Sequence, residues 1–321
     1  MLSYFTIFTA CAPVFIIMAS GYGCRRLKLL SKESDNSLVK LTLNLLFPAF
    51  IINHILGNPK LTDASTIATA TGTGFFFLIL SIGICFYLSV FLKSTNDQRR
   101  AFAVTTGLQN YGFIPIPIIY ALFPESSVGT IGVLLMHSIG IEIALWTAGV
   151  MMLSGNQKGG WKRLLNTPLI TTLTCLIANS AGAGNWLHGK LEGTSKMLGD
   201  CAIPLSLLLI GATIYDLLHD SDGKKAKQNK TSEAILAVGL RMIILPSLIL
   251  LYAKYSPVSP ELKKVLVIQA AMPAAVFPII LTKQYGGDTE TAVRIVIITT
   301  LISIISIPPV IVFGLWIMGL S

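Results

Sequence analysis

Runs of about 20 apolar residues recur along the whole chain and are separated by short polar connections. A run of that length crosses a hydrocarbon core of roughly 30 Å as a helix. The pattern therefore predicts an all-α membrane protein with ten transmembrane helices. We place them at residues 5–23, 36–56, 66–92, 101–123, 128–153, 168–186, 196–218, 233–253, 262–283 and 292–318.

The predicted helices form two sets of five on either side of a polar connection at 154–167. Five crossings is an odd number, so the second set enters the membrane from the opposite side, and a fold shared by both sets must be an inverted repeat. Asn44 stands four residues before Pro48, and Asp200 stands four before Pro204, at matching places in the two sets. We expect a first repeat at 1–153, a cytoplasmic linker at 154–167 and a second, inverted five-helix repeat at 168–321.

Two of the predicted spans contain residues that interrupt a helix. In 101–123, two glycines and two prolines lie between Gly107 and Pro117, and in 262–283 Pro273 and Pro278 stand at the corresponding place. Proline removes a backbone donor and glycine adds backbone freedom, so bare backbone groups are expected near the bilayer midplane. Paired interrupted helices point to a transporter's binding site, and their half-helix amino ends attract anions. The alternative is that the prolines only kink two packed helices.

Ionisable side chains inside predicted spans are costly and usually functional. Glu142 is a candidate proton acceptor, cation ligand or half of a structural ion pair, and His137 on the same span is a candidate to share its proton. Arg241, in 233–253, is a candidate partner for an anionic substrate or for the carboxylates of Glu142 and Asp200. His137 has a structural alternative as a hydrogen-bonded core residue.

Composition and charge support this picture. The chain is 53% hydrophobic and 12% charged, which excludes most soluble folds. The net charge of +9 does not indicate nucleic acid, because the basic residues lie in short clusters between apolar runs. The connections after odd-numbered helices, taken with the adjoining helix ends, hold 17 Lys and Arg residues, and those after even-numbered helices, counted in the same way, hold six. This predicts cytoplasmic odd connections and both termini outside. The order of charges around residues 5–24 favours a retained helix over a signal peptide.

No motif for an enzyme or a nucleotide site is present, and the five cysteines are widely spaced in apolar segments. We predict no metal and no resident cofactor. The absence of a nucleotide motif favours secondary transport over a pump.

The broken spans, with Asn110 and Gly112 before Pro115 and with Pro273 in the second half, resemble the auxin efflux carrier family, which is distantly related to bile acid:sodium symporters. The resemblance implies a scaffold of helices 1, 2, 6 and 7, a transport domain of helices 3–5 and 8–10, substrate at the crossing of helices 4 and 9, elevator-like movement and a homodimer formed through the scaffold. The short connection at 154–167 is similar to that of bacterial members, which are associated with small carboxylates. Gln269 stands where an asparagine would mirror Asn110.

We therefore predict a secondary active transporter of a small organic anion, a mono- or dicarboxylate, in the plasma membrane (a bacterial inner membrane), coupled to a proton through Glu142 and His137 or to sodium. Its partners would be this anion, membrane lipids and a second copy of the chain. The alternatives are a sodium-coupled symporter of a steroid-like or neutral organic solute and a non-transporting membrane sensor. The candidate substrate-binding residues are Gln109, Asn110, Tyr111, Gly112, Ile114, Pro115, Arg241, Gln269, Met272, Pro273, Ala274 and Thr300.

Overall fold

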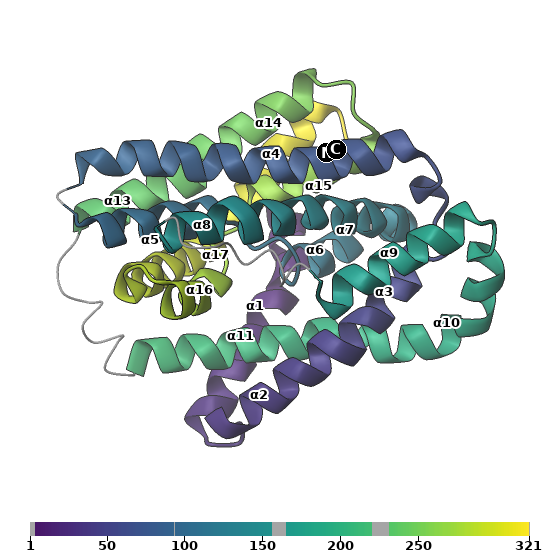
Figure 1. Ribbon diagram of the computed structural model, residues 1–321, viewed down its shortest axis with the longest axis horizontal. Helices are drawn as coiled ribbons and strands as arrows, with labels where there is room; N and C mark the ends of the chain where they lie inside the picture. Colours follow the sequence, from purple (N-terminus) through teal and green to yellow (C-terminus); the bar gives the residue numbers. More distant parts are fainter. Residues whose placement is uncertain (1–3, 93, 156–164, 220–230, 321) are drawn as a thin grey trace.

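The protein is an assembly of helices (Figure 1), as the computed structural model shows for residues 4–92, 94–155, 165–219 and 231–320. Within these ranges no β-strand is present. Seven helical segments are long and apolar enough to cross a membrane: Tyr4–Arg26, Lys32–Ile55, Ala64–Phe91, Pro124–Leu153, Gly184–His219, Thr231–Tyr255 and Thr289–Met318. The structure therefore agrees with an all-α, multi-pass membrane protein. The predicted cytoplasmic linker at 154–167 lies largely outside the described residues.

Each long segment is built from one or more named helices. They are α1 (Tyr4–Arg26), α2 (Lys32–Leu41) with η1 (Thr42–Leu46) and α3 (Phe47–Ile55), α4 (Ala64–Leu88) with η3 (Ser89–Phe91), η4 (Pro124–Ser126) with α7 (Ser127–Ala144), η5 (Leu145–Gly149) and α8 (Val150–Leu153), α10 (Gly184–Asp200) with α11 (Ala202–His219), α13 (Thr231–Gly239) with η7 (Leu240–Ile244) and α14 (Leu245–Tyr255), and α17 (Thr289–Met318). The elements η1, η5 and η7 are single π-helical turns within longer helices.

The remaining three predicted spans are shorter in the structure. One is α9 (Thr167–Ser180), with 14 residues. The other two are divided: α5 (Asn96–Gly107) is followed by α6 (Pro115–Leu122), and α15 (Pro260–Ala270) by α16 (Phe277–Tyr285). No single helix in these three regions is long enough by itself to cross a bilayer. The total of ten crossings and the inverted repeat stay predictions.

Two predicted boundaries around residue 190 are wrong. The sixth helix ends at Ser180 instead of 186, because Gly182 takes the left-handed backbone (φ +76°) that ends the run. The seventh begins at Gly184 instead of 196. Lys190 and Glu192 lie on an exposed face of α10, and these charges concealed the helix from a hydropathy criterion. Asp200 is the last residue of α10, two residues before α11 begins.

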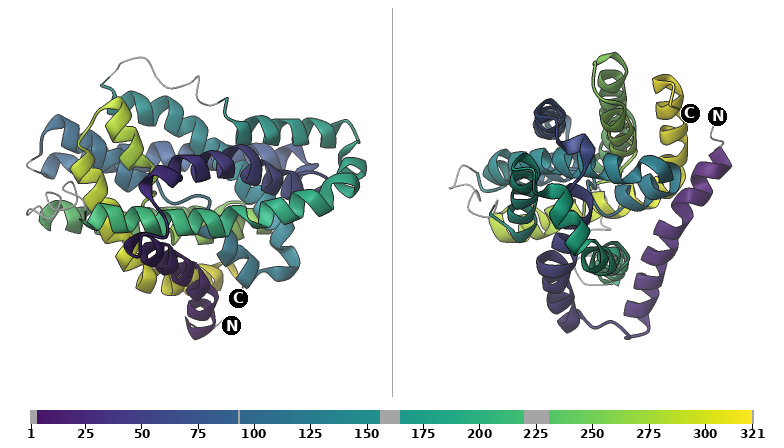
Figure 2. Two further views of the ribbon diagram at one scale, coloured as in Figure 1. Left: turned by 90° about the horizontal axis from the view of Figure 1, so that it is seen from below. Right: turned by 90° about the vertical axis from the view of Figure 1, so that its right-hand side faces the viewer.

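Helices α2, α3, α10 and α11 lie along the lower edge of Figure 1, and α4, α5, α7, α13 and α14 lie across its upper part. Helix α1 packs against α11 of the first group and against α17. The outer ends of α1 and α17 lie side by side in every view (Figure 2). The two ends of the described chain therefore share one side of the molecule.

Glycines let two pairs of long helices approach closely. A Cβ added to Gly74 of α4 would lie 2.0 Å from the His137 carbonyl oxygen on α7, and one added to Gly140 of α7 would lie 1.9 Å from the Thr71 carbonyl oxygen. Gly21 of α1 and Gly211 of α11 approach the partner backbone in the same way. In a membrane the hydrophobic effect does not drive helices together, because lipid tails are as apolar as the side chains. Small residues at the interface let the backbones approach and pack closely instead. These contacts fix α4 to α7 and α1 to α11.

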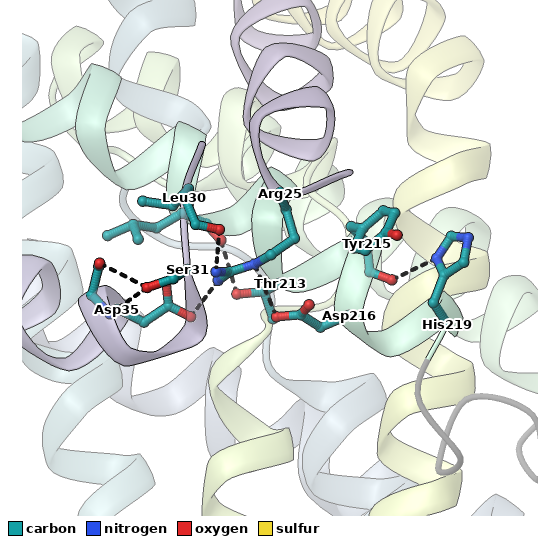
Figure 3. A network of polar contacts seen from close by, with 10 residues as sticks. Arg25, Leu30, Ser31, Asp35, Thr213, Tyr215, Asp216 and His219 are labelled. Carbon is teal, nitrogen blue, oxygen red and sulfur yellow. Dashed lines mark hydrogen bonds and ion pairs between the residues drawn. The ribbon is translucent and has the colours of Figure 1, made fainter. Parts of the chain in front are cut away.

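A charged network joins the end of α1 to α2 and α11 (Figure 3). Arg25 donates to the Leu30 carbonyl oxygen at 2.7 Å, forms an ion pair with Asp35, and lies 3.3 Å from Asp216 between Nε and Oδ2. The Arg25 side chain is almost fully buried, so its charge is compensated by two carboxylates. The network fastens the first connection of the chain to the end of α11.

We expect Gly74→Ala to lower the free energy of unfolding by about 1–3 kcal/mol, because the new methyl group overlaps the α7 backbone. The matched control is Gly72→Ala on the same helix, where an added Cβ meets nothing within 4 Å. Thermal unfolding of the two variants in detergent measures the difference. Equal melting temperatures for both variants would show that α4 and α7 are not packed at this distance.

Candidate functional site

The two divided spans meet at their breaks, which run from Leu108 to Ile114 and from Ala271 to Val276. The Asn110 amide donates to the Pro273 carbonyl oxygen at 2.8 Å, and the Ala275 amide donates to the Leu108 carbonyl oxygen at 2.9 Å. Gln109 and Ala274 form an antiparallel bridge between these bonds. The predicted breaks are therefore present, and the two extended segments lie against each other.

Local sequence explains both breaks. Pro115 and Pro117 are tolerated at the start of α6, where the first amides have no helical acceptor, but they prevent one regular helix from running through the break into α6. Leu108 already has extended backbone angles (φ −86°, ψ 110°). In the second half, Pro273 lacks an amide and disfavours helical angles at Met272. Extended backbone in a membrane protein needs an outside partner, and each break supplies that partner to the other.

Polar side chains complete the crossing. Gln269 donates through Nε2 to the Tyr111 carbonyl oxygen at 3.1 Å, and the Ser138 hydroxyl donates to the same oxygen at 3.2 Å. The Ala274 amide donates to the Thr299 hydroxyl at 3.3 Å. Asn110 accepts through Oδ1 from the Ile114 amide at 3.3 Å and so connects the two ends of the first break. Side chains from α7, α15 and α17 thus hold the break residues in place.

Arg241 lies beside the crossing, in the π-helical turn η7. Its side chain is fully buried, and Nη1 donates to the carbonyl oxygen of Gly107, the last residue of α5, at 3.2 Å. Its Nε and Nη2 atoms have no hydrogen-bond partner in the described part of the chain, where no ion pair joins it to Glu142 or Asp200 either. The carboxyl end of a helix carries partial negative charge, so the guanidinium stabilises the interrupted end of α5.

A small pocket with a volume of about 40 Å³ opens next to the crossing. It lies between α3, the first break, α6, α7 and α9. Residues that represent these walls are Phe47 and Ile51 of α3, Tyr111 and Gly112 of the break, Glu142 of α7 and Leu169 of α9. A Cβ added to Gly112 would meet nothing within 4 Å, so this residue leaves the space beside it open.

Glu142 is the charged residue among the described residues that line the pocket. Its Oε2 atom accepts from Nδ2 of Asn166 at 3.2 Å. Asn166 also caps α9, because its Oδ1 accepts from the Leu169 amide at 2.9 Å. Our sequence reasoning missed Asn166, although an Asn two residues before a Pro is a recognisable helix start.

The structure places the predicted site residues in three groups. Tyr111, Gly112 and Glu142 line the pocket. The residues of the crossing, or in direct contact with it, are Gln109, Asn110, Ile114, Pro115, Gln269, Met272, Pro273 and Ala274. Arg241, His137 and Thr300 are buried but are not among the pocket's lining residues.

His137 and Thr300 are both buried, and neither lines the pocket. His137 lies 3.3 Å from the Thr73 hydroxyl through Nδ1 and so connects α7 to α4. Glu142 is bonded by Asn166 and not by this histidine. On α17 the hydroxyl that contacts the crossing belongs to Thr299, the neighbour of Thr300. The side chains of His137 and Thr300 are therefore buried between helices and do not line the pocket.

Interrupted helices that meet beside a pocket are typical of secondary transporters. A family described as "Membrane transport protein" matches residues 6–163 and 186–311 of the chain. The chain therefore belongs to this family, the auxin efflux carrier family, and is a membrane transporter and not an enzyme.

Relatives from bacteria and archaea have similar length. An "Uncharacterized transporter" from Methanothermobacter thermautotrophicus is 23% identical over 307 residues, covering 92% of this chain and 94% of the relative. "Uncharacterized transporter YfdV" from Escherichia coli is 21% identical over 316 residues, and "Uncharacterized transporter MJ1031" from Methanocaldococcus jannaschii is 21% identical over 299 residues, with the same coverage. The similarity extends over nearly the whole of each chain.

Gly112→Val should fill the pocket without disturbing the fold, because the added carbons project into open space. We expect the variant to unfold at the wild-type temperature but to lose any stabilisation by a pocket ligand, since a ligand raises stability only where it binds. Thermal unfolding with and without a panel of carboxylates measures both. Gly83→Val, on an exposed part of α4 where an added Cβ also meets nothing, is the control. An undiminished ligand shift in Gly112→Val would exclude this pocket as the binding site.

Proposed function

We propose that the protein is a secondary active transporter that carries a small organic anion, a mono- or dicarboxylate, across the plasma membrane by elevator-like alternating access. The observation that carries the proposal is the pair of hydrogen-bonded breaks next to the pocket. At such a crossing the ends of α5, α6, α15 and α16 lie close together, and the backbone groups of the breaks are bonded within the protein instead of being exposed to lipid.

The preference for an anion is supported by helix ends and by a fixed positive charge. Helix α6 begins at Pro115, three residues after Gly112 of the pocket, and its dipole places partial positive charge near that end of the pocket. The amides of Ile114 and Ile116 already donate to Asn110 and Gly112, so the dipole and not a free amide would act on the anion. Arg241 adds a buried positive charge at Gly107, the last residue of α5 before the first break. The apolar side chains of Phe47, Ile51 and Leu169 would enclose the carbon skeleton of the solute.

The elevator mechanism is supported by where the pocket lies. Its walls are α3 and α9, which the family resemblance assigns to the scaffold, and α6, α7 and the first break, which it assigns to the transport domain. Packing is also repeated between halves: α5 packs against α17, and α15 packs against α7. Each broken helix is thus supported by the last helix of the opposite half, which suits two inverted repeats that move as one body.

Further parts of the proposal concern orientation, assembly and coupling. Both termini would lie outside a bacterial inner membrane, and two copies would associate through scaffold helices. Glu142, in the pocket wall, would carry a coupling proton. Sodium is the alternative coupling ion, with Gln269 near the crossing as a ligand, because its Oε1 atom is buried without a hydrogen-bond partner in the described chain. The largely apolar pocket also suits a neutral organic solute, which keeps a sodium-coupled symporter as the second candidate.

Purified protein in proteoliposomes should take up at least one labelled carboxylate with saturable kinetics, and Gly112→Val should abolish this flux. If Glu142 supplies the coupling, uptake should increase with an inward proton gradient and should not change when sodium is replaced by choline at fixed pH. Loss of uptake in choline would instead assign the coupling to sodium. Tight binding of a carboxylate without flux would indicate a sensor and contradict the transport proposal.

A further inference from the structure

A hydrogen bond between Glu142 and Asn166 joins α7 to the start of α9. Nδ2 of Asn166 donates to Oε2 of Glu142 at 3.2 Å. Helix α7 packs most closely against α4, through Gly74 and Gly140, whereas α9 packs against α3, α10 and η1. In the proposed elevator movement α4 and α7 shift relative to α3 and α9, so this bond crosses the boundary between the two groups of helices.

Asn166 is held firmly on the α9 side of that boundary. Its Oδ1 atom accepts from the Leu169 amide at 2.9 Å, which caps α9. The hydroxyl of the next residue, Thr167, donates to Oδ1 of Asn44 in η1 at 2.7 Å. The amide group that reaches Glu142 therefore belongs to a fixed helix start.

The strength of the bond depends on whether Glu142 is ionised. A hydrogen bond to a carboxylate is stronger than one to a neutral acceptor. The amino end of α9, a helix of 14 residues, also carries partial positive charge, which favours a carboxylate beside it. Protonation of Glu142 weakens both interactions at once.

The charge at this place depends on Glu142 and not on a neighbouring side chain. Tyr111 is the other titratable residue of the described pocket lining, and a phenol carries no charge at physiological pH. No salt bridge joins Glu142 to a basic residue in the described chain. The titratable side chains on α7, and on the elements packed against it, that do not line the pocket are His54, Lys60, Cys85, Tyr87, Tyr120, Glu125, His137, Cys175, Glu261, Lys263 and Lys264.

We infer that Asn166 is a positioning residue that makes the conformation of the transporter depend on the charge of Glu142. While Glu142 is ionised, the bond holds α7 to α9 and favours the arrangement of helices seen here. When the carboxylate takes up a proton from solvent, the bond weakens and the population shifts toward the other position of α4 and α7. The inference rests on the proposed function, in which Glu142 carries a coupling proton, and it adds the contact through which that proton acts on the helices.

Asn166→Ser separates this role from helix capping. A serine at this position also accepts from the Leu169 amide, but it has no side-chain amide to donate to Glu142. Glu142→Gln is the second variant, because it keeps the shape of the side chain and is neutral at every pH. The matched control is Thr167→Ala, which removes the neighbouring bond between α9 and η1 without touching Glu142.

The distance between two spin labels, measured by pulsed EPR, reports the movement in the absence of any solute. The labels are placed on exposed positions of α4 and α9 through Phe76→Cys and Ile177→Cys. Cys24 and Cys201, the native cysteines that are not buried, are replaced by alanine. The measurement gives the ratio of two populations at acidic and at alkaline pH.

With Asn166 present, acidification should change this ratio roughly tenfold toward a second distance, as expected when a hydrogen bond to a charged group is weakened. In Asn166→Ser and in Glu142→Gln the ratio should differ by less than about twofold between the two pH values, because the charge-dependent bond is missing. Thr167→Ala should keep the tenfold change.

Uptake of labelled carboxylates by proteoliposomes, measured in parallel, separates this inference from the transport proposal. A pH-dependent ratio that Asn166→Ser leaves intact, or no pH dependence in a protein that shows saturable uptake, would overturn the inference and leave transport standing. Loss of the pH dependence in Asn166→Ser without uptake of any carboxylate would support the role of Asn166 and contradict transport. Neither a pH-dependent ratio nor uptake would overturn both.

Discussion

The structure depends on one constraint: backbone amides and carbonyls in the interior of a membrane protein must find partners within the protein. The extended segments around Asn110 and Pro273 satisfy it by pairing with each other. Neither break can persist without the other, because each would leave bare amides and carbonyls in an apolar setting. The two halves of the chain are thereby joined at the place where a solute is proposed to bind.

Buried charges, like buried backbone groups, have partners within the protein. Arg25 and Arg294 lie at helix ends and are paired with carboxylates of neighbouring helices, Asp35 and Glu233 among them. Among the described ion pairs, none joins Arg241 to Glu142: Arg241 donates to the Gly107 carbonyl oxygen, and Glu142 accepts from Asn166. The two charges have separate effects. Arg241 stabilises the carboxyl end of α5 at the first break, and Glu142 would interact with a solute in the pocket.

Close packing provides the rigidity that such a site needs. Gly74 and Gly140 bring α4 against α7, and Gly21 and Gly211 bring α1 against α11. The pocket lies between α3, α7, α9 and the first break. In the proposed elevator mechanism, a solute in this pocket would contact helices of both groups, and its surroundings would change when one group moves relative to the other.

Much of this architecture was readable from the sequence. Apolar runs predicted the seven long spans. Pro115, Pro117 and Pro273 predicted the breaks, because the effect of proline on a helix is local and does not depend on the tertiary structure. The extent of α10 was not readable, since its exposed charges hide it from any measure of hydropathy.

The partners of the buried polar groups were decided by tertiary structure alone. Arg241 with the Gly107 carbonyl, His137 with Thr73, and Glu142 with Asn166 all join different helices. Helical periodicity specifies which residues share a face of one helix, but not which faces of two helices meet. That choice is made by the packing of the whole molecule, and it determined that the carboxylate of Glu142 lies in the pocket wall and the guanidinium of Arg241 does not.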